Sequence, residues 1–431
     1  MSNSLNSLFD VKHVDWCKNA TIYEVYLRQY TPSGTINEFS NYLPRLKELG
    51  VDILWLMPIQ PIGEKNRKGS MGSPYAIRDY VSVNKDMGTL DDLIKLVKQA
   101  HDLGMHVILD WVANHTAWDH TWIDEHPEFY MHDAEGNIIH PAHTDWYDVA
   151  DLNFENQGLR TKMIESLKYW IQVADIDGYR CDMAGLVPTD FWETVRNELD
   201  KIKPVFMLAE AEQPDLHYKA FDISYNWAVH HMMNDIAWGN RSAWHLDEFF
   251  ANDANNYDKN ALRLYFTSNH DENKNAGSAI ERLGNAYKAM TLLTYTLPGM
   301  PLIFSGQEAG LNRKLSFFEK DQIDWNSGGA YFEFYKKLNQ LRKNQKAIWS
   351  GREGGDMQRI YSQINDKIFA FTRKKDKSEV LAVFNLSPHF LNFKLEGIHE
   401  FIASKCYFDG HTLASENLSM AGWEYRLYIK N

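Results

Sequence analysis

Cysteine is scarce in this sequence of 431 residues, and long apolar runs are missing. Cys17, Cys181 and Cys406 lie far apart, which excludes both a disulfide framework and the close spacing of a cysteine metal site. No apolar stretch reaches the roughly 20 residues that a membrane-spanning helix needs. The first residues also lack the basic segment and apolar run of a secretory signal. The sequence therefore predicts a cytoplasmic protein without a membrane partner.

Basic residues are also fewer than acidic ones. Lysine and arginine number 45 against 58 aspartates and glutamates, which gives a formal net charge of −13. Proteins that bind nucleic acids need a basic surface, so we expect no nucleic-acid partner and favour an uncharged substrate. The remaining composition, 44% hydrophobic and 24% charged, is that of a globular chain with one large domain and one or two smaller ones.

Short apolar segments alternate with longer segments of helical periodicity through most of the chain. The helical periodicity is clearest over residues 37–49, 90–103 and 159–174. The apolar segments, interpreted as strands, are residues 21–26, 52–57, 106–110, 178–182, 205–210, 220–224, 263–268 and 301–304. Eight strand–helix units in succession predict an α/β fold of the (β/α)8 TIM-barrel type.

Two regions depart from this alternation. Residues 116–153 are rich in His, Asp, Trp and Pro and show no strong periodicity, which indicates a short inserted domain after the third strand. From residue 351 the apolar residues recur with period two, as expected for an antiparallel β-sandwich. We therefore predict a barrel formed by residues 1–115 and 154–350, an inserted domain at 116–153 and a C-terminal β-sandwich domain at 351–431.

Polar side chains gather where four of the predicted strands end. In a TIM barrel these ends meet on the face that carries the active site. Grouping carboxylates costs desolvation and repulsion, so packing alone does not explain the pattern. The four clusters are Asp110 with Asn114 and His115, Arg180 with Asp182, Glu210 with Glu212, and Asn269 with His270 and Asp271.

Alternation along a strand places Arg180 and Asp182 on one face, where the arginine is expected to keep the carboxylate ionised and to orient it. Glu210 and Glu212 also share one face, so alternation does not choose between them. Two carboxylates that share a proton are the equipment for hydrolysis of a glycosidic bond. Aromatic faces stack on sugar rings, and the residues expected to rim the same end are Tyr75, Trp111, Trp118, Trp122, Trp146 and Tyr147.

These segments resemble the sequence motifs of the α-amylase family of glycoside hydrolases, family 13, and the resemblance extends over essentially the whole chain. Four of them match the family's main motifs in the expected order, and two more are similar to its shorter motifs. The four are Asp110-Trp-Val-Ala-Asn114-His115, Gly178-Tyr-Arg180-Cys-Asp182, Leu208-Ala-Glu210-Ala and Phe266-Thr-Ser-Asn269-His270-Asp271. The two others are Ser73-Pro-Tyr75-Ala-Ile-Arg-Asp79-Tyr80 and Ala150-Asp151-Leu152-Asn153.

The resemblance implies a role for each matching residue. Asp182 would be the nucleophile, Glu210 the acid and base, and Asp271 a third carboxylate that holds the sugar hydroxyls. Arg180 would orient Asp182, and Tyr75 would stack on the sugar. The remaining substrate-binding residues would be Asp110, His115 and His270.

The chain also departs from the family pattern. Exo-acting α-glucosidases of the family usually carry Asp after the stacking tyrosine, and Ala76 at this position favours an open cleft and internal cleavage. Many secreted α-amylases have Lys-His a few residues after the nucleophile, serving a sugar subsite and a calcium ion, where this chain has Ala184-Gly185-Leu186. Calcium is therefore not supported despite Asn114, and we expect neither a metal nor another cofactor.

The resemblance implies a retaining hydrolase that cleaves α-1,4-glucosidic bonds in starch-derived glucans and malto-oligosaccharides by double displacement. Alternatives on the same scaffold are an α-1,6-acting glucosidase and a transglycosylase. A non-catalytic carbohydrate-binding relative is disfavoured, because such proteins lack the carboxylate set that this chain retains.

Overall fold

The architecture was examined in a computed structural model that describes residues 9–326 and 329–430. In this part of the chain eight parallel strands close into a barrel, in the order β1-β10-β9-β8-β7-β6-β3-β2. The TIM barrel predicted from the sequence is thereby confirmed. Its strands are β1 (Ile22–Val25), β2 (Ile53–Leu56), β3 (His106–Val112), β6 (Gly178–Asp182), β7 (Phe206–Ala209), β8 (Ile223–Tyr225), β9 (Leu262–Phe266) and β10 (Met300–Phe304).

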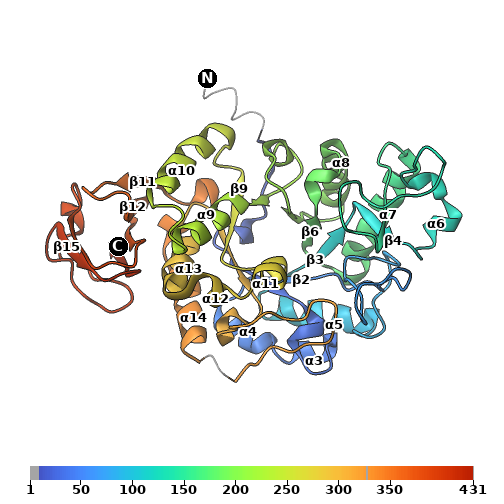
Figure 1. Ribbon diagram of the computed structural model, residues 1–431, viewed down its shortest axis with the longest axis horizontal. Coiled ribbons are helices and arrows are strands. Elements are labelled where there is room, and N and C mark those ends of the chain that lie inside the picture. Colours follow the sequence, from blue (N-terminus) through green and yellow to red (C-terminus); the bar gives the residue numbers. More distant parts are fainter. Residues whose placement is uncertain (1–8, 327–328, 431) are drawn as a thin grey trace.

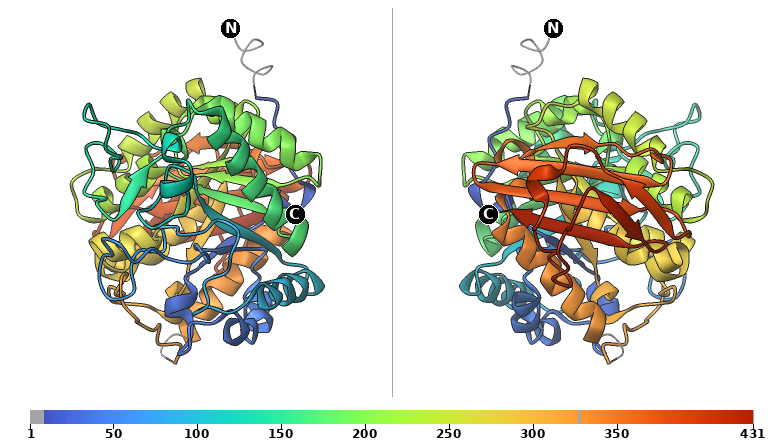
Figure 2. Two further views of the ribbon diagram at one scale, coloured as in Figure 1. Left: turned by 90° about the vertical axis from the view of Figure 1, so that its right-hand side faces the viewer. Right: turned by 90° about the vertical axis from the view of Figure 1, so that its left-hand side faces the viewer.

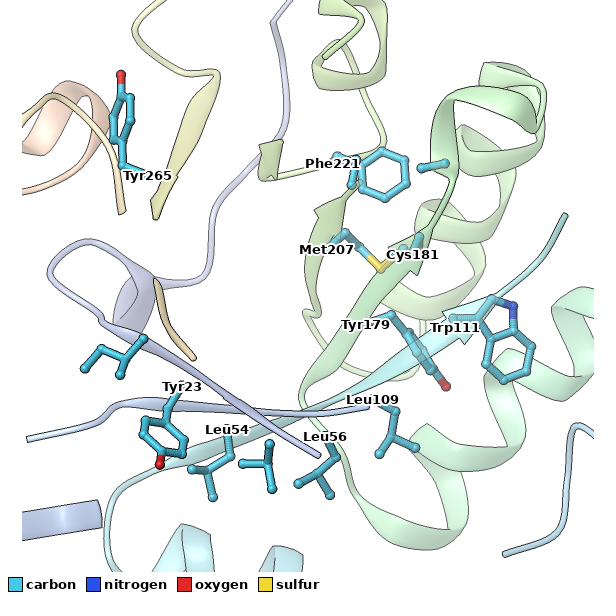
Figure 3. Packing of buried hydrophobic residues seen from close by; sticks show 14 of the residues in the cluster. Tyr23, Leu54, Leu56, Leu109, Trp111, Tyr179, Cys181, Met207, Phe221 and Tyr265 are labelled. Carbon is cyan, nitrogen blue, oxygen red and sulfur yellow. The ribbon is translucent and has the colours of Figure 1, made fainter. Parts of the chain in front are cut away.

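Alternation along these strands divides the core into two layers. On β2, Ile53 and Trp55 point into the barrel, whereas Leu54 and Leu56 point outward. The outward layer, part of which Figure 3 shows, packs between the barrel and its helices. The same alternation turns Tyr179 and Cys181 outward, so that Arg180 and Asp182 face the barrel interior.

Helices surround the barrel, and local sequence sets their ends. Thr89 and Asp92 form a capping box at the start of α5. The predicted helix over residues 37–49 is two helices, α3 and α4, because the chain turns at Asn41 and Tyr42 before Pro44 restarts it. The helices around the barrel are α2 (Leu27–Tyr30), α3 (Ile36–Ser40), α4 (Leu43–Leu49), α5 (Leu90–Asp102), α7 (Gln157–Ala174), α8 (Thr189–Asp200), α9 (Trp227–Ala237), α10 (Trp244–Asn256), α11 (His270–Ala276), α12 (Ala279–Leu283), α13 (Tyr287–Thr296) and α14 (Gly329–Asn344).

The segment after β3 leaves the barrel, as expected from its missing periodicity. It begins with β4 (His115–Ala117), which pairs antiparallel with β5 (Val149–Asp151), and it contains the short helix α6 (Trp122–Glu125). The β4–β5 pair ties both ends of the insertion to the C-terminal end of β3. The domain boundaries given above remain predictions.

The C-terminal strands form two antiparallel sheets, in agreement with the predicted sandwich. One sheet has the order β11-β12-β13-β16, and the other contains β14 and β15. Ile368, Val383 and Phe393 belong to the core between these sheets, whereas Phe369 and Phe384 pack with the barrel's outer core. The larger sheet is therefore buried on both faces. The strands are β11 (Asp356–Ile360), β12 (Ile368–Lys375), β13 (Ser378–Asn385), β14 (Leu391–Lys394), β15 (Asn417–Met420) and β16 (Tyr425–Lys430).

The insertion and the C-terminal sheets lie at opposite ends of the molecule's longest axis (Figure 1). Figure 2 shows each end in turn, with the insertion facing the viewer on the left and the C-terminal strands on the right. Among the described residues, no helix is both long and apolar enough to cross a membrane.

Candidate active site

The guanidinium of Arg180 on β6 is the centre of the polar cluster at the C-terminal end of the barrel. Its Nη1 lies 2.9 Å from Asp110 Oδ1 and 2.9 Å from Asp182 Oδ1, and its Nη2 lies 3.0 Å from Glu210 Oε2. Arg180 is fully buried, and the ring of Trp55 lies against its charge at 4.9 Å. One cation thus joins carboxylates from the ends of three neighbouring strands.

Backbone geometry holds β6 close to β7, beginning at the N-terminal end of β6. Gly178 has φ +148°, and a Cβ there would lie 1.9 Å from the carbonyl oxygen of Phe206 on β7, so that only glycine fits. At the other end of β6, Met183 has φ 44°, and its N–H donates to Glu210 Oε2 at 2.9 Å. This turn after Asp182 fixes the position of the Glu210 carboxylate.

The two facing carboxyl groups hold protons more strongly than free ones. Burial raises the pKa of Asp182 to about 6, with Arg180 acting against this rise and Asp110 adding to it. Burial raises the pKa of Glu210 to about 7, again opposed by Arg180, while Asp182 adds to the rise. We expected Arg180 to keep Asp182 ionised, but its single charge is shared among three carboxylates.

Asp271 belongs to a second cluster on the other side of the site. Asn269 caps helix α11 by accepting the N–H of Glu272, which places His270 and Asp271 in the first turn. His270 Nε2 lies 3.2 Å from Asp271 Oδ2, and His270 Nδ1 lies 2.5 Å from Glu24 Oε1 on β1. The histidine is therefore held between two carboxylates.

Charge decides the protonation of this second cluster. Burial alone would lower the pKa of His270, but the carboxylates of Asp271 and Glu24 outweigh burial and raise it to about 10. Burial would raise the pKa of Asp271, yet the charged His270 outweighs it and holds this pKa below its usual range. Asp271 is thus an anion beside an imidazolium, whereas Glu210 retains a proton near neutral pH.

Tyr75 connects the two clusters. Its hydroxyl donates to Asp110 Oδ2 at 3.0 Å and lies 2.8 Å from His270 Nε2. Trp55 Nε1 also donates to Asp110 Oδ2, at 3.0 Å. Asp110 therefore supports Arg180 and Tyr75 from below, and burial raises its own pKa to about 6.

Two adjoining cavities open over these groups. The first, of about 120 Å³, contains all three expected catalytic residues together with Tyr75 and His115. The second, of about 570 Å³, shares Met183 and Glu210 with the first and continues past Leu186 and Trp227. Glu210 thus lies where the two cavities meet, and the two cavities together are called the groove below.

Each predicted site residue lies in or directly beneath this groove. Asp182, Glu210, Asp271, Tyr75 and His115 line the first cavity, and Asp110, Arg180 and His270 support its floor through the contacts above. Burial lowers the pKa of His115 to about 4, so that its ring is neutral. The structure also separates the two glutamates, because Glu212 lies 3.3 Å from Arg263 on β9 rather than against Arg180.

Several aromatic residues expected at the rim lie elsewhere. Only Tyr75 and Trp146 of the six line the cavity that contains Asp182. Trp111 is fully buried in the outer core, and Trp122 packs against Tyr80 and Phe129. The outward orientation of Trp111 could have been predicted, because Trp111 directly follows the inward-facing Asp110 on β3.

The position expected to open the cleft does not face it. Ala76 is buried in a small cluster with Ile62, Ala117 and Val149. The residues after Asp182, from Met183 to Leu186, offer no side-chain oxygen to a calcium ion, and the Asn114 amide lies 3.3 Å from His115 Nδ1. That no calcium ion binds here remains a prediction from the sequence.

Other residues at the site were not singled out from the sequence. Glu24 is a carboxylate within the apolar strand β1, and this unusual position could have marked it as a candidate site residue. Lys68 and Asp148 form a 3.1 Å ion pair at the cavity wall, and Phe317 and Phe318 line the wall that follows β10. Lys68, Asp148, Phe317 and Phe318 lie in loops or in the insertion, where no sequence periodicity predicts the position of a side chain.

Comparisons with known proteins agree with this geometry. The family model described as "Alpha amylase, catalytic domain" matches residues 17–149 and 140–328. The solved maltogenic alpha-amylase AmyB from Thermotoga neapolitana is 30% identical, with a TM-score of 0.87 over 96% of this chain and 98% of AmyB.

Two relatives found by sequence are longer than this chain. Alpha-amylase MalA from Haloarcula japonica is 24% identical over 86% of this chain and 56% of MalA. The alpha-1,4-glucan:maltose-1-phosphate maltosyltransferase of Salinibacter ruber is 27% identical over 83% of this chain and 57% of that protein. The chain thus spans somewhat more than half the length of these two relatives. From the family match over most of its length, together with the carboxylates gathered around Arg180, the chain belongs to the alpha-amylase family of glycoside hydrolases.

Proposed function

We propose that this protein hydrolyses α-1,4-glucosidic bonds inside starch-derived glucans and malto-oligosaccharides, with net retention at the anomeric carbon. The observation that carries the proposal is the contact of Arg180 with both Asp182 and Glu210 in a cavity that Asp271 also lines. Retaining glycosidases need one ionised and one protonated carboxyl group on either side of the scissile bond. Burial raises the pKa of both groups, Asp182 to about 6 and Glu210 to about 7, so the pair can retain one proton near neutral pH.

In the first step Glu210 protonates the glycosidic oxygen while the Asp182 carboxylate attacks the anomeric carbon. The bond between that carbon and the leaving oxygen breaks, the shortened glucan leaves with the proton, and a glycosyl ester forms on Asp182. Glu210 is now an anion, stabilised by Arg180 and by the N–H of Met183. Asp182 serves as nucleophile because Arg180 and the strand geometry aim its carboxylate into the cavity.

In the second step Glu210 takes a proton from a water molecule, whose oxygen attacks the same carbon and releases Asp182. Two inversions give net retention. Asp271, held by the cationic His270, would bind ring hydroxyls in the cavity that it lines, and this binding strengthens as the sugar distorts toward the transition state. Tyr75 presents its ring to the same sugar, held in place by its bond to Asp110.

The groove supports cleavage within a chain rather than at its end. It continues on both sides of Glu210, with Tyr75 and Trp146 on one side and Leu186 and Trp227 on the other. A substrate can therefore extend past the cleaved bond in both directions. The partner is thus a neutral glucan, and neither a nucleic acid nor a membrane is required; the cytoplasmic location stays a prediction from the sequence.

Transglycosylation is the second candidate, favoured by the apolar side of the groove. Leu186 is 55% exposed there, beside Pro214 and Trp227. Apolar and aromatic surface holds a sugar acceptor in place of water, and an acceptor hydroxyl would then attack the glycosyl ester. The maltosyltransferase relative from Salinibacter ruber is consistent with this alternative.

The test uses maltoheptaose and follows the products by NMR before mutarotation. We expect shorter oligosaccharides in the α configuration, formed without an early excess of glucose. Initial β-anomers would contradict retention, and products longer than the substrate would favour transglycosylation. Isomaltose and pullulan, tested in parallel, report α-1,6 cleavage. Asp182→Asn should abolish turnover while the far-UV spectrum stays native, and appreciable residual turnover would refute the role of Asp182.

A further inference from the structure

A cluster of two histidines and one carboxylate lies at the end of the barrel opposite to the groove. His101 belongs to the last turn of α5, His106 is the first residue of β3, and Asp177 directly precedes β6. β3 and β6 are neighbours in the barrel, so their N-terminal ends bring His106 and Asp177 together. One ligand atom from each of the three residues lies within 4.8 Å of the others.

The geometry of this cluster is set by its surroundings. Asp177 Oδ2 lies 2.7 Å from His101 Nε2 and accepts the N–H of Val107 at 2.8 Å, while Asp177 Oδ1 lies 3.6 Å from His106 Nδ1. The ring of Trp16 stacks on that of His106, with centroids 3.8 Å apart and an interplanar angle of 11°. These contacts hold the imidazoles and the carboxylate in place from separate elements.

One atom of the cluster makes no close hydrogen bond. Nδ1 of His106 is buried from solvent, and its 3.6 Å contact with Asp177 Oδ1 is an ion-pair distance that is too long for a hydrogen bond. This nitrogen faces the carboxylate of Asp177, as a ligand atom that shares an ion with that carboxylate would.

We propose that His101, His106 and Asp177 form a binding site for a divalent transition-metal ion, with Zn²⁺ as the fitting ion. Two imidazole nitrogens and one carboxylate oxygen suit zinc, which takes a tetrahedral set with water in the fourth position. Calcium and magnesium need oxygen ligands and do not match this set. On binding, the ion replaces the proton between His101 Nε2 and Asp177, and this proton passes to solvent.

Two neighbouring charges tune the site. Asp175 Oδ2 lies 3.7 Å from His101 Nδ1, where it orients the ring from outside the ligand set. Lys203 Nζ lies 2.6 Å from Asp175 Oδ1 and 3.4 Å from Asp177 Oδ1, so its positive charge competes with the ion for the carboxylates. Removal of this lysine charge should therefore strengthen metal binding, an effect that no purely structural ion pair would produce.

The ion would join α5, β3 and β6 at the end of the barrel that carries no catalytic group. Its role is then to stabilise the fold, and bound zinc should raise the melting temperature without changing turnover. A metal could not be expected from the sequence, because the spacing of His101 and His106 matches no familiar motif and Asp177 is distant in the chain.

The test uses the full chain after removal of metals with EDTA. Isothermal titration with Zn²⁺ should show one ion per chain, and titration with Co²⁺ should give the strong visible absorption of a tetrahedral site. His106→Gln should weaken zinc binding by at least about tenfold and abolish the cobalt spectrum, since even residues outside a ligand set change affinity 10- to 100-fold. His126→Gln, a histidine in the insertion, is the matched control and should bind as the parent does.

Lys203→Met provides the second arm. We expect tighter zinc binding with unchanged activity on maltoheptaose. Absence of stoichiometric binding to the parent protein would overturn the proposal, as would equal binding by the parent and His106→Gln. Weaker binding by Lys203→Met would overturn it too, because the lysine would then be part of what holds the ion.

Discussion

At the scale of single residues, the site contains more negative than positive charge. Arg180 and His270 face the carboxyl groups of Asp110, Asp182, Glu210, Asp271 and Glu24. Burial makes an uncompensated anion expensive, so at least one of these groups must keep a proton near neutral pH. The acids that Arg180 contacts are where this proton is held, because burial raises the pKa of Asp110, Asp182 and Glu210.

This distribution of protons predicts a bell-shaped dependence of kcat/KM on pH. Below about pH 6 Asp182 gains a proton and loses its nucleophilic form. Above about pH 7 Glu210 loses the proton that the leaving oxygen needs. We expect the maximum between these values, measured with maltoheptaose at constant ionic strength. Because the two carboxyl groups interact, the two limbs belong to the pair rather than to either residue. A rate that keeps rising through pH 8 would contradict the assignment of Glu210 as the acid.

The substitution Glu210→Gln removes the proton donor. We expect kcat/KM for maltoheptaose to fall about 10²- to 10⁴-fold, the usual contribution of a general acid. An aryl maltoside with an activated phenol as leaving group needs no protonation, so its first step should be nearly unaffected. Pre-steady-state release of the phenol separates this step from the hydrolysis of the glycosyl ester.

The matched control for that substitution is Glu212→Gln. Glu212 lies two residues further along the chain and contacts Arg263 instead of Arg180. Its loss should change the rate on both substrates only slightly. If Glu212→Gln showed the leaving-group dependence and Glu210→Gln did not, the two glutamates would have to exchange roles.

At the scale of elements, regular periodicity was predictable and loop positions were not. Apolar segments of the sequence predict the barrel strands. Alternation along β6 predicts that Arg180 and Asp182 share one face. Alternation could not decide which of Glu210 and Glu212 belongs to the site, since this depends on the arginine that each one contacts in the folded barrel. The groove walls were missed because Lys68 and Phe317 lie in loops, where tertiary contacts set position.

The inserted segment contributes Trp146 to the wall of the groove. Its ring lies 5.6 Å from that of His115 and faces the cavity that contains Asp182. Trp146→Ala should raise KM for maltoheptaose about three- to tenfold with a smaller change in kcat, as expected for loss of one aromatic contact of roughly 0.5–1.5 kcal/mol. Steady-state kinetics with maltotriose and maltoheptaose measure the effect.

Trp244→Ala is the control for this element. Trp244 is a partly exposed tryptophan on α10 that lines neither half of the groove. Its substitution should leave both kinetic constants unchanged. A similar rise in KM for both variants would indicate a general loss of stability, and an unchanged KM for Trp146→Ala would remove this residue from the binding surface.

At the scale of the whole molecule, the larger C-terminal sheet behaves as part of the barrel's covering. Period-two alternation is typical of an antiparallel sheet with one solvent-facing side, but here Phe369 and Phe384 pack into the barrel's outer core. The alternation in the sequence therefore separates two different cores, one against the barrel and one against β14 and β15. The period of apolar residues along a strand cannot reveal which structural element covers each face of the sheet, so the two cores could not be distinguished from the sequence.

Arg373 on β12 links this sheet to the barrel. It is fully buried, and its Nη1 donates to the carbonyls of Thr296 and Leu297 at the C-terminal end of α13, both at 3.0 Å. Its Nε donates to Gly355 at 2.9 Å and its Nη2 to Trp349 at 2.7 Å. A cation at a helix C-terminus meets unpaired carbonyls and the negative end of the helix dipole.

Arg373→Met should consequently lower the free energy of unfolding by at least about 3 kcal/mol, because it leaves several buried carbonyls without donors at roughly 1–3 kcal/mol each. Guanidinium denaturation followed by fluorescence measures the change. Arg352→Met is the control, since Arg352 also joins the C-terminal region to the barrel, but through a 2.6 Å pair with Asp258 in which its side chain is 52% exposed. Such a pair contributes about 1 kcal/mol or less. If both variants lost equal stability, the buried arginine would not be what couples the sheet to the barrel, and the apolar contacts of Phe369 and Phe384 would have to account for it.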